Sequence, residues 1–329
     1  MSTPPTDSYQ RRIDYLRVSV TDRCNLRCTY CMPAGGVPKL DHTEILRYEE
    51  ILRLVRIAAR TGISKIRITG GEPLVRKDIL YLCENISHIP EVQSVSITTN
   101  GVLLERFAED LLRVGVKRIN ISLDTLKPDK YALITREDCF HQVWRGIEAA
   151  REAGLNPIKL NAVAMRGVND DELADLARLT FDHPFHVRFI EFMPFGEEEC
   201  TSSFISADEI LARLSEVAPL IPAETQDGNG PARHYRFQGA MGKIGIISPV
   251  SRHFCATCNR LRLTADGKLR TCLFSTEETD MKSLIREGLL DDDLFATLRK
   301  AIREKPERHH LASGSLRKCV NRPMVAIGG

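Results

Sequence analysis

The chain has 329 residues, 43% of them hydrophobic and 27% charged, and its 46 basic and 44 acidic residues leave a net charge of +2. This length suffices for one large domain with an extension or for two domains. The near balance of charge argues against a nucleic-acid or membrane-surface binder, because both need a marked basic excess. Any anionic ligand must therefore be held by Arg and Lys side chains placed at its own site.

The N-terminal segment, Met-Ser-Thr-Pro-Pro-Thr-Asp, is polar and lacks the apolar stretch of a secretory signal. No apolar run elsewhere approaches the ~20 residues that a membrane-spanning helix needs. We therefore expect a cytoplasmic protein with no nucleic-acid partner and no membrane partner.

Short β-like runs recur along the first part of the chain, separated by helix-like patterns. Tyr48–Arg60 has its apolar residues on one helix face. Gly62, Gly115 and Gly154 stand where helix C-terminal caps are expected, just before the next strand. The predicted strands are Tyr15–Val20, Lys65–Thr69, Ser94–Thr98, Arg118–Ser122, Ile158–Val163 and Val187–Glu191.

Six alternating strand–helix units predict a parallel sheet with crossover helices. Six units are fewer than a closed barrel needs, so the predicted fold is α/β, a partial (β/α)6 barrel of the TIM type. An open doubly wound sheet is the alternative. Because the alternation stops near residue 195, we expect the barrel over residues 1–195. Residues 196–329 then form a C-terminal extension that packs against it and contains a charged helix at Asp291–Glu304.

Ten cysteines are many for a cytoplasmic chain, in which disulfides are not expected. Six of them form two groups of three, and the other four are interpreted as isolated thiols. The first group has the spacing C-x3-C-x2-C and the second C-x2-C-x13-C. The members are Cys24, Cys28 and Cys31 in the first group and Cys255, Cys258 and Cys272 in the second.

Both groups are predicted to hold iron–sulfur clusters, because thiolates are the usual protein ligands of such clusters. Three ligands for four irons leave one iron open to a substrate or cofactor. A zinc site needs a fourth ligand. None lies close to the first group, but His253 precedes Cys255 and keeps zinc open as an alternative at the second. The intervening run Asn259–Thr264 reads as a strand on which Arg260 and Arg262 share one face, which suits an anion.

The first group resembles the signature of the radical S-adenosylmethionine superfamily, in which an aromatic residue, here Tyr30, precedes the last cysteine. The resemblance implies a partial barrel and a cluster whose open iron binds S-adenosylmethionine, which is cleaved to methionine and a 5′-deoxyadenosyl radical. Gly70-Gly71-Glu72-Pro73 is similar to the motif that binds the methionine amino group in that superfamily. The residues implied at this cofactor are Tyr30, Gly71, Ser122 and Met193.

The chain as a whole resembles the GTP 3′,8-cyclase family of molybdenum cofactor biosynthesis. The second cysteine group and the terminal glycines discriminate, because the first motif is common to the whole superfamily. The matching segments are C-x3-C-x2-C, Arg67-Ile-Thr-Gly-Gly-Glu-Pro, Thr98-Thr-Asn-Gly, Asn120-Ile-Ser-Leu-Asp, Lys159-Leu-Asn, Arg188-Phe-Ile-Glu-Phe-Met, Phe254-Cys-Ala-Thr-Cys-Asn-Arg-Leu-Arg and Gly328-Gly329.

This resemblance implies two [4Fe-4S] clusters, with S-adenosylmethionine at the first and the guanine of the substrate GTP at the second. The radical takes the 3′ hydrogen of GTP, and C3′ then bonds to C8 of guanine, giving (8S)-3′,8-cyclo-7,8-dihydroguanosine 5′-triphosphate. The resemblance also implies an external electron donor, a cyclic pyranopterin monophosphate synthase that consumes the product, and a homodimer.

Triphosphate binding needs cations, and several lie on the predicted strands. If Arg17 on the first strand points inward, Val18 points outward. An inward Arg17 is costly unless an anion pairs with it, which favours a cavity that holds an anion over a filled core. The resemblance places Gly328 and Gly329, the C-terminal tail, near the site. The residues implied at GTP are Arg17, Arg67, Thr98, Lys159, Arg260, Leu261 and Arg262, and Arg188 is a further candidate cation.

Two other functions stay open. A different radical enzyme with an auxiliary cluster, such as a peptide-modifying maturase, would share the first motif, although such enzymes usually carry more cysteines in the extension. A zinc-binding interaction module would share only the cysteines. His309 and His310, after the charged helix, are interpreted as solvated.

Overall fold

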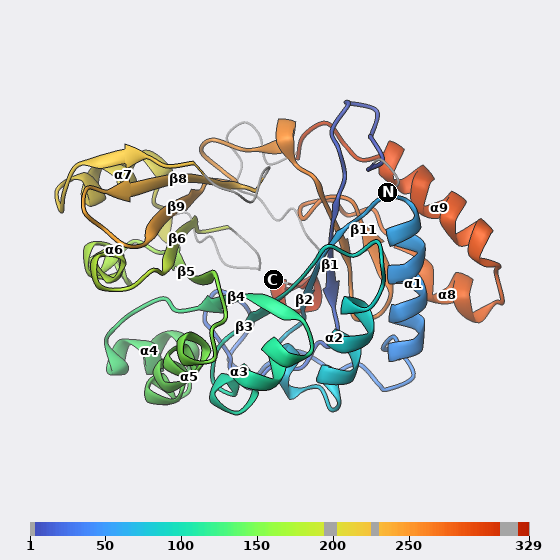
Figure 1. The fold of residues 1–329 in the computed structure, drawn as a ribbon, viewed down its shortest axis with the longest axis horizontal. Helices are drawn as coiled ribbons and strands as arrows, with labels where there is room; N and C mark the ends of the chain where they lie inside the picture. Colours follow the sequence, from blue (N-terminus) through green and yellow to red (C-terminus); the bar gives the residue numbers. More distant parts are fainter. Residues whose placement is uncertain (1–3, 194–202, 225–229, 310–321, 329) are drawn as a thin grey trace.

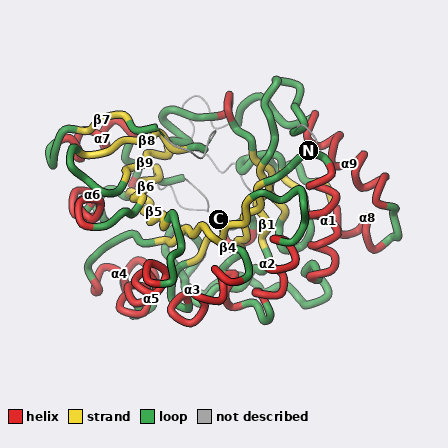
Figure 2. Tube along the Cα trace, viewed as in Figure 1, coloured by secondary structure: helices red, strands yellow, loops and turns green. Residues whose placement is uncertain are grey.

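The computed structural model describes residues 4–193, 203–224, 230–309 and 322–328. Strands occupy the middle of the molecule and helices its outside (Figures 1 and 2). Every helix in these ranges is too short or too polar to cross a lipid bilayer.

Six parallel strands alternate with helices along the first part of the chain, as predicted. All six predicted strands are present, with bounds that differ by no more than two residues. The elements are β1 Tyr15–Ser19, α1 Tyr48–Arg60, β2 Lys65–Thr69, α2 Ile79–Ser87, β3 Ser94–Thr99, α3 Leu104–Arg113, β4 Val116–Ser122, α4 Pro128–Thr135, α5 Phe140–Glu152, β5 Ile158–Ala164, α6 Leu173–Asp182 and β6 His186–Glu191.

The rest of the chain supplies short strands and three further helices. The predicted helix at Asp291–Glu304 is present and ends one residue earlier. The elements are α7 Ala207–Ser215, β7 Leu220–Pro222, β8 Ala232–Phe237, β9 Lys243–Ile247, β10 Arg260–Leu263, β11 Lys268–Arg270, β12 Thr279–Asp280, α8 Met281–Arg286 and α9 Asp291–Arg303.

The extension does more than pack against the barrel, because its strands continue the same sheet. Within the described residues the sheet has 12 strands in the order β12-β11-β10-β1-β2-β3-β4-β5-β6-β9-β8-β7. β10 pairs in parallel with β1, and β9 pairs in parallel with β6, so both edges of the six-stranded unit are covered. Antiparallel β11 and β8 follow outside them. The result is a partial barrel whose edges come from the extension.

The hydrophobic core lies between the outer faces of the strands and the helices. On β1, Leu16 and Val18 enter this core, while Arg17 between them faces the inside of the barrel. α1 contributes fully buried Ile51 and Val55. At 25 cal/mol per Å2, burying each such side chain contributes about 1.5–3 kcal/mol to folding. The alternation on β1 confirms that Arg17 points inward.

A tight backbone contact marks the place where β9 joins β6. Gly242, just before β9, donates its N–H to the carbonyl of Thr180 at 2.8 Å. A Cβ on Gly242 would lie 2.2 Å from the carbonyl oxygen of Phe185 and 2.8 Å from that of His183. Only glycine fits, so this junction depends on a missing side chain.

We therefore expect Gly242→Ala to lower the free energy of unfolding by about 1–3 kcal/mol, the usual cost of overpacking. Chemical denaturation followed by circular dichroism measures the loss. Gly35→Ala is the matched control, because a Cβ there meets nothing within 4 Å. Equal stability of the two variants would contradict the close packing of this junction.

Candidate functional site

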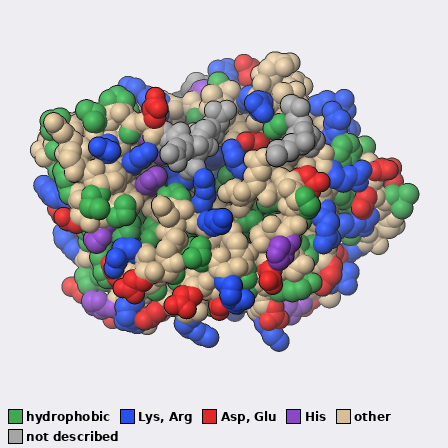
Figure 3. All heavy atoms as spheres, in the orientation of Figure 1, with side chains coloured by type: hydrophobic (Ala, Val, Ile, Leu, Met, Phe, Trp, Pro, Cys, Tyr) green, Lys and Arg blue, Asp and Glu red, His purple; other side chains and the backbone are tan. Residues whose placement is uncertain are grey.

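A cavity of about 700 Å3 occupies the inside of the partial barrel and reaches both cysteine groups. All six grouped cysteines line it, together with side chains from β1 through β6 and from β10. Lys and Arg side chains are visible near the middle of the face that Figure 3 shows. The sheet thus joins two thiol groups that lie at opposite ends of the sequence.

The first cysteine group lies on the loop after β1, and the Gly-Gly-Glu segment after β2 holds that loop. The N–H of Gly71 donates to the carbonyl of Thr21 at 2.7 Å, and that of Glu72 donates to Arg23 at 2.8 Å. A Cβ on Gly71 would lie 2.3 Å from the carbonyl oxygen of Arg23. The glycine is needed because the cysteine loop packs directly on its backbone.

Glu72 connects the Gly-Gly-Glu segment to the end of β3. Its carboxylate, 1% exposed, accepts hydrogen bonds from the N–H of Leu74 at 3.0 Å, the hydroxyl of Thr99 at 2.8 Å and the N–H of Asn100 at 2.7 Å. Burial raises the pKa of Glu72 to about 7, against the effect of these hydrogen bonds. The side chain of Asn100 in turn donates to Asn25 in the cysteine loop at 2.8 Å.

Asp124, directly after β4, holds Tyr30 of the cysteine loop from the other side. The Tyr30 hydroxyl donates to Asp124 Oδ2 at 2.8 Å, and the N–H of Val163 donates to Oδ1 at 2.8 Å. Burial raises the pKa of Asp124 to about 6 and also raises that of Tyr30. The loop that carries the first thiols is therefore clamped between the ends of β2 and β4.

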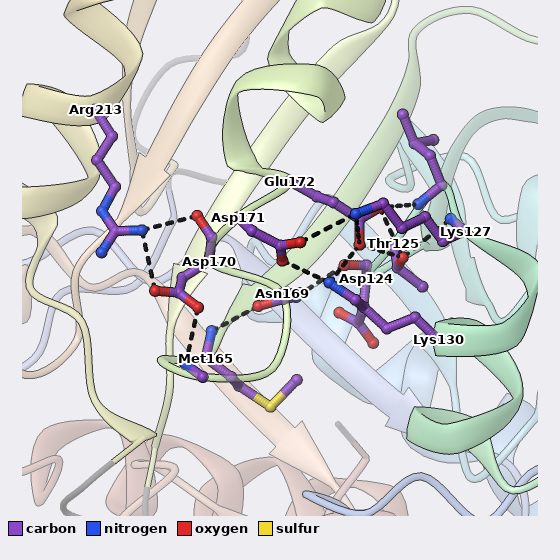
Figure 4. A network of polar contacts seen from close by, with 12 residues as sticks. Asp124, Thr125, Lys127, Lys130, Met165, Asn169, Asp170, Asp171, Glu172 and Arg213 are labelled. Atoms are coloured by element: carbon purple, nitrogen blue, oxygen red, sulfur yellow. Dashed lines mark hydrogen bonds and ion pairs between the residues drawn. The ribbon is translucent and has the colours of Figure 1, made fainter.

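A polar network beneath Asp124 fixes its backbone (Figure 4). The amide of Asn169 donates to the carbonyl oxygens of Asp124 and Val163, each at 2.8 Å. Buried Glu172 accepts from the hydroxyl of Thr125 at 2.8 Å and pairs with Lys130 at 2.7 Å. These positioning residues were missed by sequence reasoning. The only signal for Asp124 was its place at a strand end.

The second cysteine group lies beside β10 under an aromatic wall. His309 is buried there; its Nε2 lies 2.9 Å from the carbonyl of Pro249, and its ring packs on Phe274 at 4.9 Å and on His253 at 5.4 Å. The interpretation of His309 as solvated was wrong, because the chain after α9 folds back over the cavity. His310 lies outside the described residues.

The two thiol groups sit in different electrostatic surroundings. Burial raises the pKa of Cys24 to about 11 and that of Cys31 to about 12. Burial also acts to raise the pKa of Cys258, but the positive charges of Lys305 and Arg260 lower it below its ordinary value. Burial raises the pKa of Cys255, so the favourable surroundings in the second group are those of Cys258.

The arrangement of the thiols suits clusters better than single ions. In the described part of the chain, no three or more His, Cys, Asp or Glu side chains are arranged to hold one metal ion. Thiolates of a four-iron cluster each bind a different iron and need not converge on a point.

Three guanidiniums lie side by side on the inner face of the sheet. Strand register pairs Arg17 on β1 with Arg262 on β10 and with Arg67 on β2. Burial lowers the pKa of Arg17 well below its ordinary value, and repulsion from Arg262 and Arg67 adds to this. Burial and repulsion from Arg260 lower the pKa of Arg262 to about 10. These three guanidiniums are called the basic row below. Because a row of like charges is costly without an anion, this face of the cavity is suited to a polyanionic ligand.

Neutral polar atoms line the same face of the cavity, between the basic row and β5. Thr98 pairs in register with Asn120, which pairs with Lys159. Thr98 Oγ1, Asn120 Oδ1 and Asn161 Oδ1 are buried, line the cavity and have no hydrogen-bond partner among the described residues. Buried polar atoms are normally satisfied, so these three match the contacts of a polar ligand.

The described C-terminal segment, residues 322–328, contacts two members of the basic row. The carbonyl oxygen of Gly328 accepts hydrogen bonds from Arg17 at 3.0 Å and from Arg262 at 3.1 Å. Ile327 is 1% exposed and packs with Phe274, which anchors the segment. Gly329 lies outside the described residues.

Of the predicted cofactor and substrate residues, only one places its side chain elsewhere. Leu261 belongs to the hydrophobic core, because strand alternation turns it away from Arg260 and Arg262. Its prediction as a substrate contact is therefore restricted to its backbone. The predicted residues that line the cavity are Arg17, Tyr30, Arg67, Gly71, Thr98, Ser122, Lys159, Met193, Arg260 and Arg262.

Two family models match the chain. The Radical SAM superfamily model covers residues 18–180, and the Molybdenum Cofactor Synthesis C model covers residues 185–311. Among solved structures, SuiB from Streptococcus suis bound to S-adenosylmethionine has a TM-score of 0.60 at 17% identity, covering 88% of this chain and 68% of SuiB. That likeness concerns the fold alone and agrees with the partial barrel.

Curated relatives match over nearly the full length. The GTP 3′,8-cyclase of Moorella thermoacetica is 51% identical over 98% of this chain and 99% of its own length. The GTP 3′,8-cyclase of Pelotomaculum thermopropionicum is 50% identical over the same shares. The chain belongs to the GTP 3′,8-cyclase family of the radical S-adenosylmethionine superfamily.

Proposed function

We propose that this chain is a radical S-adenosylmethionine enzyme that cyclises GTP to (8S)-3′,8-cyclo-7,8-dihydroguanosine 5′-triphosphate in molybdenum cofactor biosynthesis. The observation that carries the proposal is one cavity that is lined by both three-thiol groups and by a row of guanidiniums, of which Arg17 and Arg262 are buried. Identity of 51% to a GTP 3′,8-cyclase favours this reaction over the peptide chemistry of a maturase.

The first thiol group fits the radical-forming cluster. When bound, the reduced cluster supplies the electron that cleaves S-adenosylmethionine to methionine and the 5′-deoxyadenosyl radical, which takes the 3′ hydrogen of GTP. Cys24, Cys28 and Cys31 are its proposed ligands, on a loop held by Gly71 and Glu72. We assign Tyr30, Gly71, Ser122 and Met193 to S-adenosylmethionine.

GTP is proposed to lie along the basic row, with its guanine toward the second cluster on Cys255, Cys258 and Cys272. A triphosphate carries about four negative charges and is best bound by charge-assisted hydrogen bonds. Thr98 Oγ1 supplies a neutral contact. The proposed GTP residues are Arg17, Arg67, Thr98, Lys159, Arg260, the Leu261 backbone and Arg262, with Arg188 as a further cation on the wall.

The two parts of the chain carry different clusters. We assign the radical-forming cluster to residues 1–195 and the second cluster to residues 196–329, which reach the cavity through β10 and the C-terminal segment, and both parts supply residues to GTP. The reaction also requires an external one-electron donor. We further propose cytoplasmic localisation, a homodimer, and a cyclic pyranopterin monophosphate synthase as the consumer of the product.

The direct test is an anaerobic assay of reconstituted enzyme with dithionite, S-adenosylmethionine and GTP. We expect about eight irons per chain, together with 5′-deoxyadenosine and a cyclised nucleotide in the products. Substituting Ala at Cys24, Cys28 and Cys31 should abolish both products. Substituting Ala at the second cysteine group should leave about four irons and abolish the cyclised nucleotide. A colourless zinc protein, or consumption of a peptide in place of GTP, would contradict the proposal.

Arg67→Met tests the basic row. Losing one charge-assisted contact costs about 1.5–3 kcal/mol, so the Kd for GTP should rise roughly 10- to 100-fold. The ligand-free protein should be no less stable, because repulsion of Arg17 is relieved. Anaerobic calorimetric titration with GTP measures the affinity. Arg106→Met, at an exposed position on α3, is the matched control. An unchanged Kd in Arg67→Met would remove Arg67 from the GTP site.

Deletion of Gly328 and Gly329 tests the tail. The deletion removes the carbonyl that orients Arg17 and Arg262. We expect the iron content and circular dichroism spectrum to stay as in the full chain, while the cyclised nucleotide disappears. Product analysis by chromatography measures this. Normal cyclisation by the shortened chain would show that the tail is dispensable.

A further inference from the structure

A buried lysine lies beside the second cysteine group. Lys305, just after α9, is 2% exposed. Its Nζ donates hydrogen bonds to the carbonyl oxygen of Arg260 at 3.0 Å and to that of Thr271. Arg260 follows Cys258 by two positions, and Thr271 directly precedes Cys272. The ammonium therefore bridges the two backbone segments that carry these thiols.

No carboxylate among the described residues pairs with this ammonium, which instead donates to the two carbonyl oxygens. The nearby buried Arg11 differs, because its guanidinium pairs with Asp7 at 2.6 Å and also donates to the carbonyl of Cys255 at 2.8 Å. A buried cation is costly unless an anion lies close to it. Lys305 is close enough to Cys255 and Cys258 to interact electrostatically with their thiolates, which form when these cysteines bind iron.

The surroundings of the two thiol groups are opposite in sign. Beside the first group lie two buried carboxylates, Glu72 and Asp124, and Asp124 accepts a hydrogen bond from Tyr30 of the cysteine loop. Beside the second group lies the buried ammonium of Lys305, which is bound to the backbone at Arg260 and Thr271. The fixed charge nearest the second group therefore favours added negative charge there, and the charges nearest the first group disfavour it.

We propose that Lys305 is the counter-cation of the second iron–sulfur cluster, which holds the cluster in place and raises its reduction potential. The inference rests on the proposed second cluster. Reduction adds one negative charge to a cluster, and a fixed positive charge in a buried site stabilises the reduced form. Lys305 is thus a positioning and tuning residue rather than a catalytic one.

The test isolates the second cluster by substituting Ala at Cys24, Cys28 and Cys31 in the full chain. In that background, a redox titration followed by electron paramagnetic resonance gives the midpoint potential of the remaining cluster. We expect Lys305→Met to lower the midpoint potential and Lys305→Arg to restore it toward the parent value. The matched control is Lys300→Met on α9, whose side chain is 68% exposed and should leave the potential unchanged.

Further variants decide the outcome if Lys305→Met loses the cluster. Lys305→Gln keeps N–H donors but carries no charge. Loss of iron or a lowered potential in Lys305→Gln, with retention in Lys305→Arg, supports the counter-cation. A parent-like potential and iron content in Lys305→Gln or Lys305→Met would overturn it. Absence of iron from the parent background itself would instead contradict the proposed second cluster, so the two failures are distinguishable.

Discussion

The crowding of like charges inside the barrel is the constraint on which the rest of the structure depends. Register between β10, β1 and β2 places Arg262, Arg17 and Arg67 side by side, the first two buried and Arg67 half-buried. A solid core of apolar side chains would be incompatible with this row. The barrel therefore stays open around a cavity, and the Gly328 carbonyl provides partial compensation for two of the three charges.

The same sheet separates two electrostatic environments. At the ends of β2 and β4, buried Glu72 and Asp124 hold the first cysteine loop by hydrogen bonds, and their charge opposes thiolate formation there. Beside β10, Lys305 and Arg260 favour the thiolate of Cys258. The two cysteine groups thus line one cavity but have neighbouring charges of opposite sign.

Local pattern was enough to predict the six strands, helix α1 and the inward side of Arg17, because side-chain alternation and helical periodicity are properties of neighbouring residues. It was not enough for the pairing of β10 with β1 or of β9 with β6, which joins segments remote in sequence. The same reason explains His309, whose burial depends on how the chain returns over the cavity. The side chain of Leu261 turns into the core, as alternation beside Arg260 already implied, so its predicted contact with GTP stays a prediction for its backbone alone.

The pairing of Tyr15 with Arg260 has a consequence for how the protein folds. β1 is central in the finished sheet, yet one of its two neighbours is made only after most of the chain. Until then β1 presents an unpaired edge, of the kind through which partly folded sheets associate wrongly. Contacts of such long sequence separation also slow folding. The sheet order therefore leaves this edge open to wrong pairing until the residues of β10 have been made.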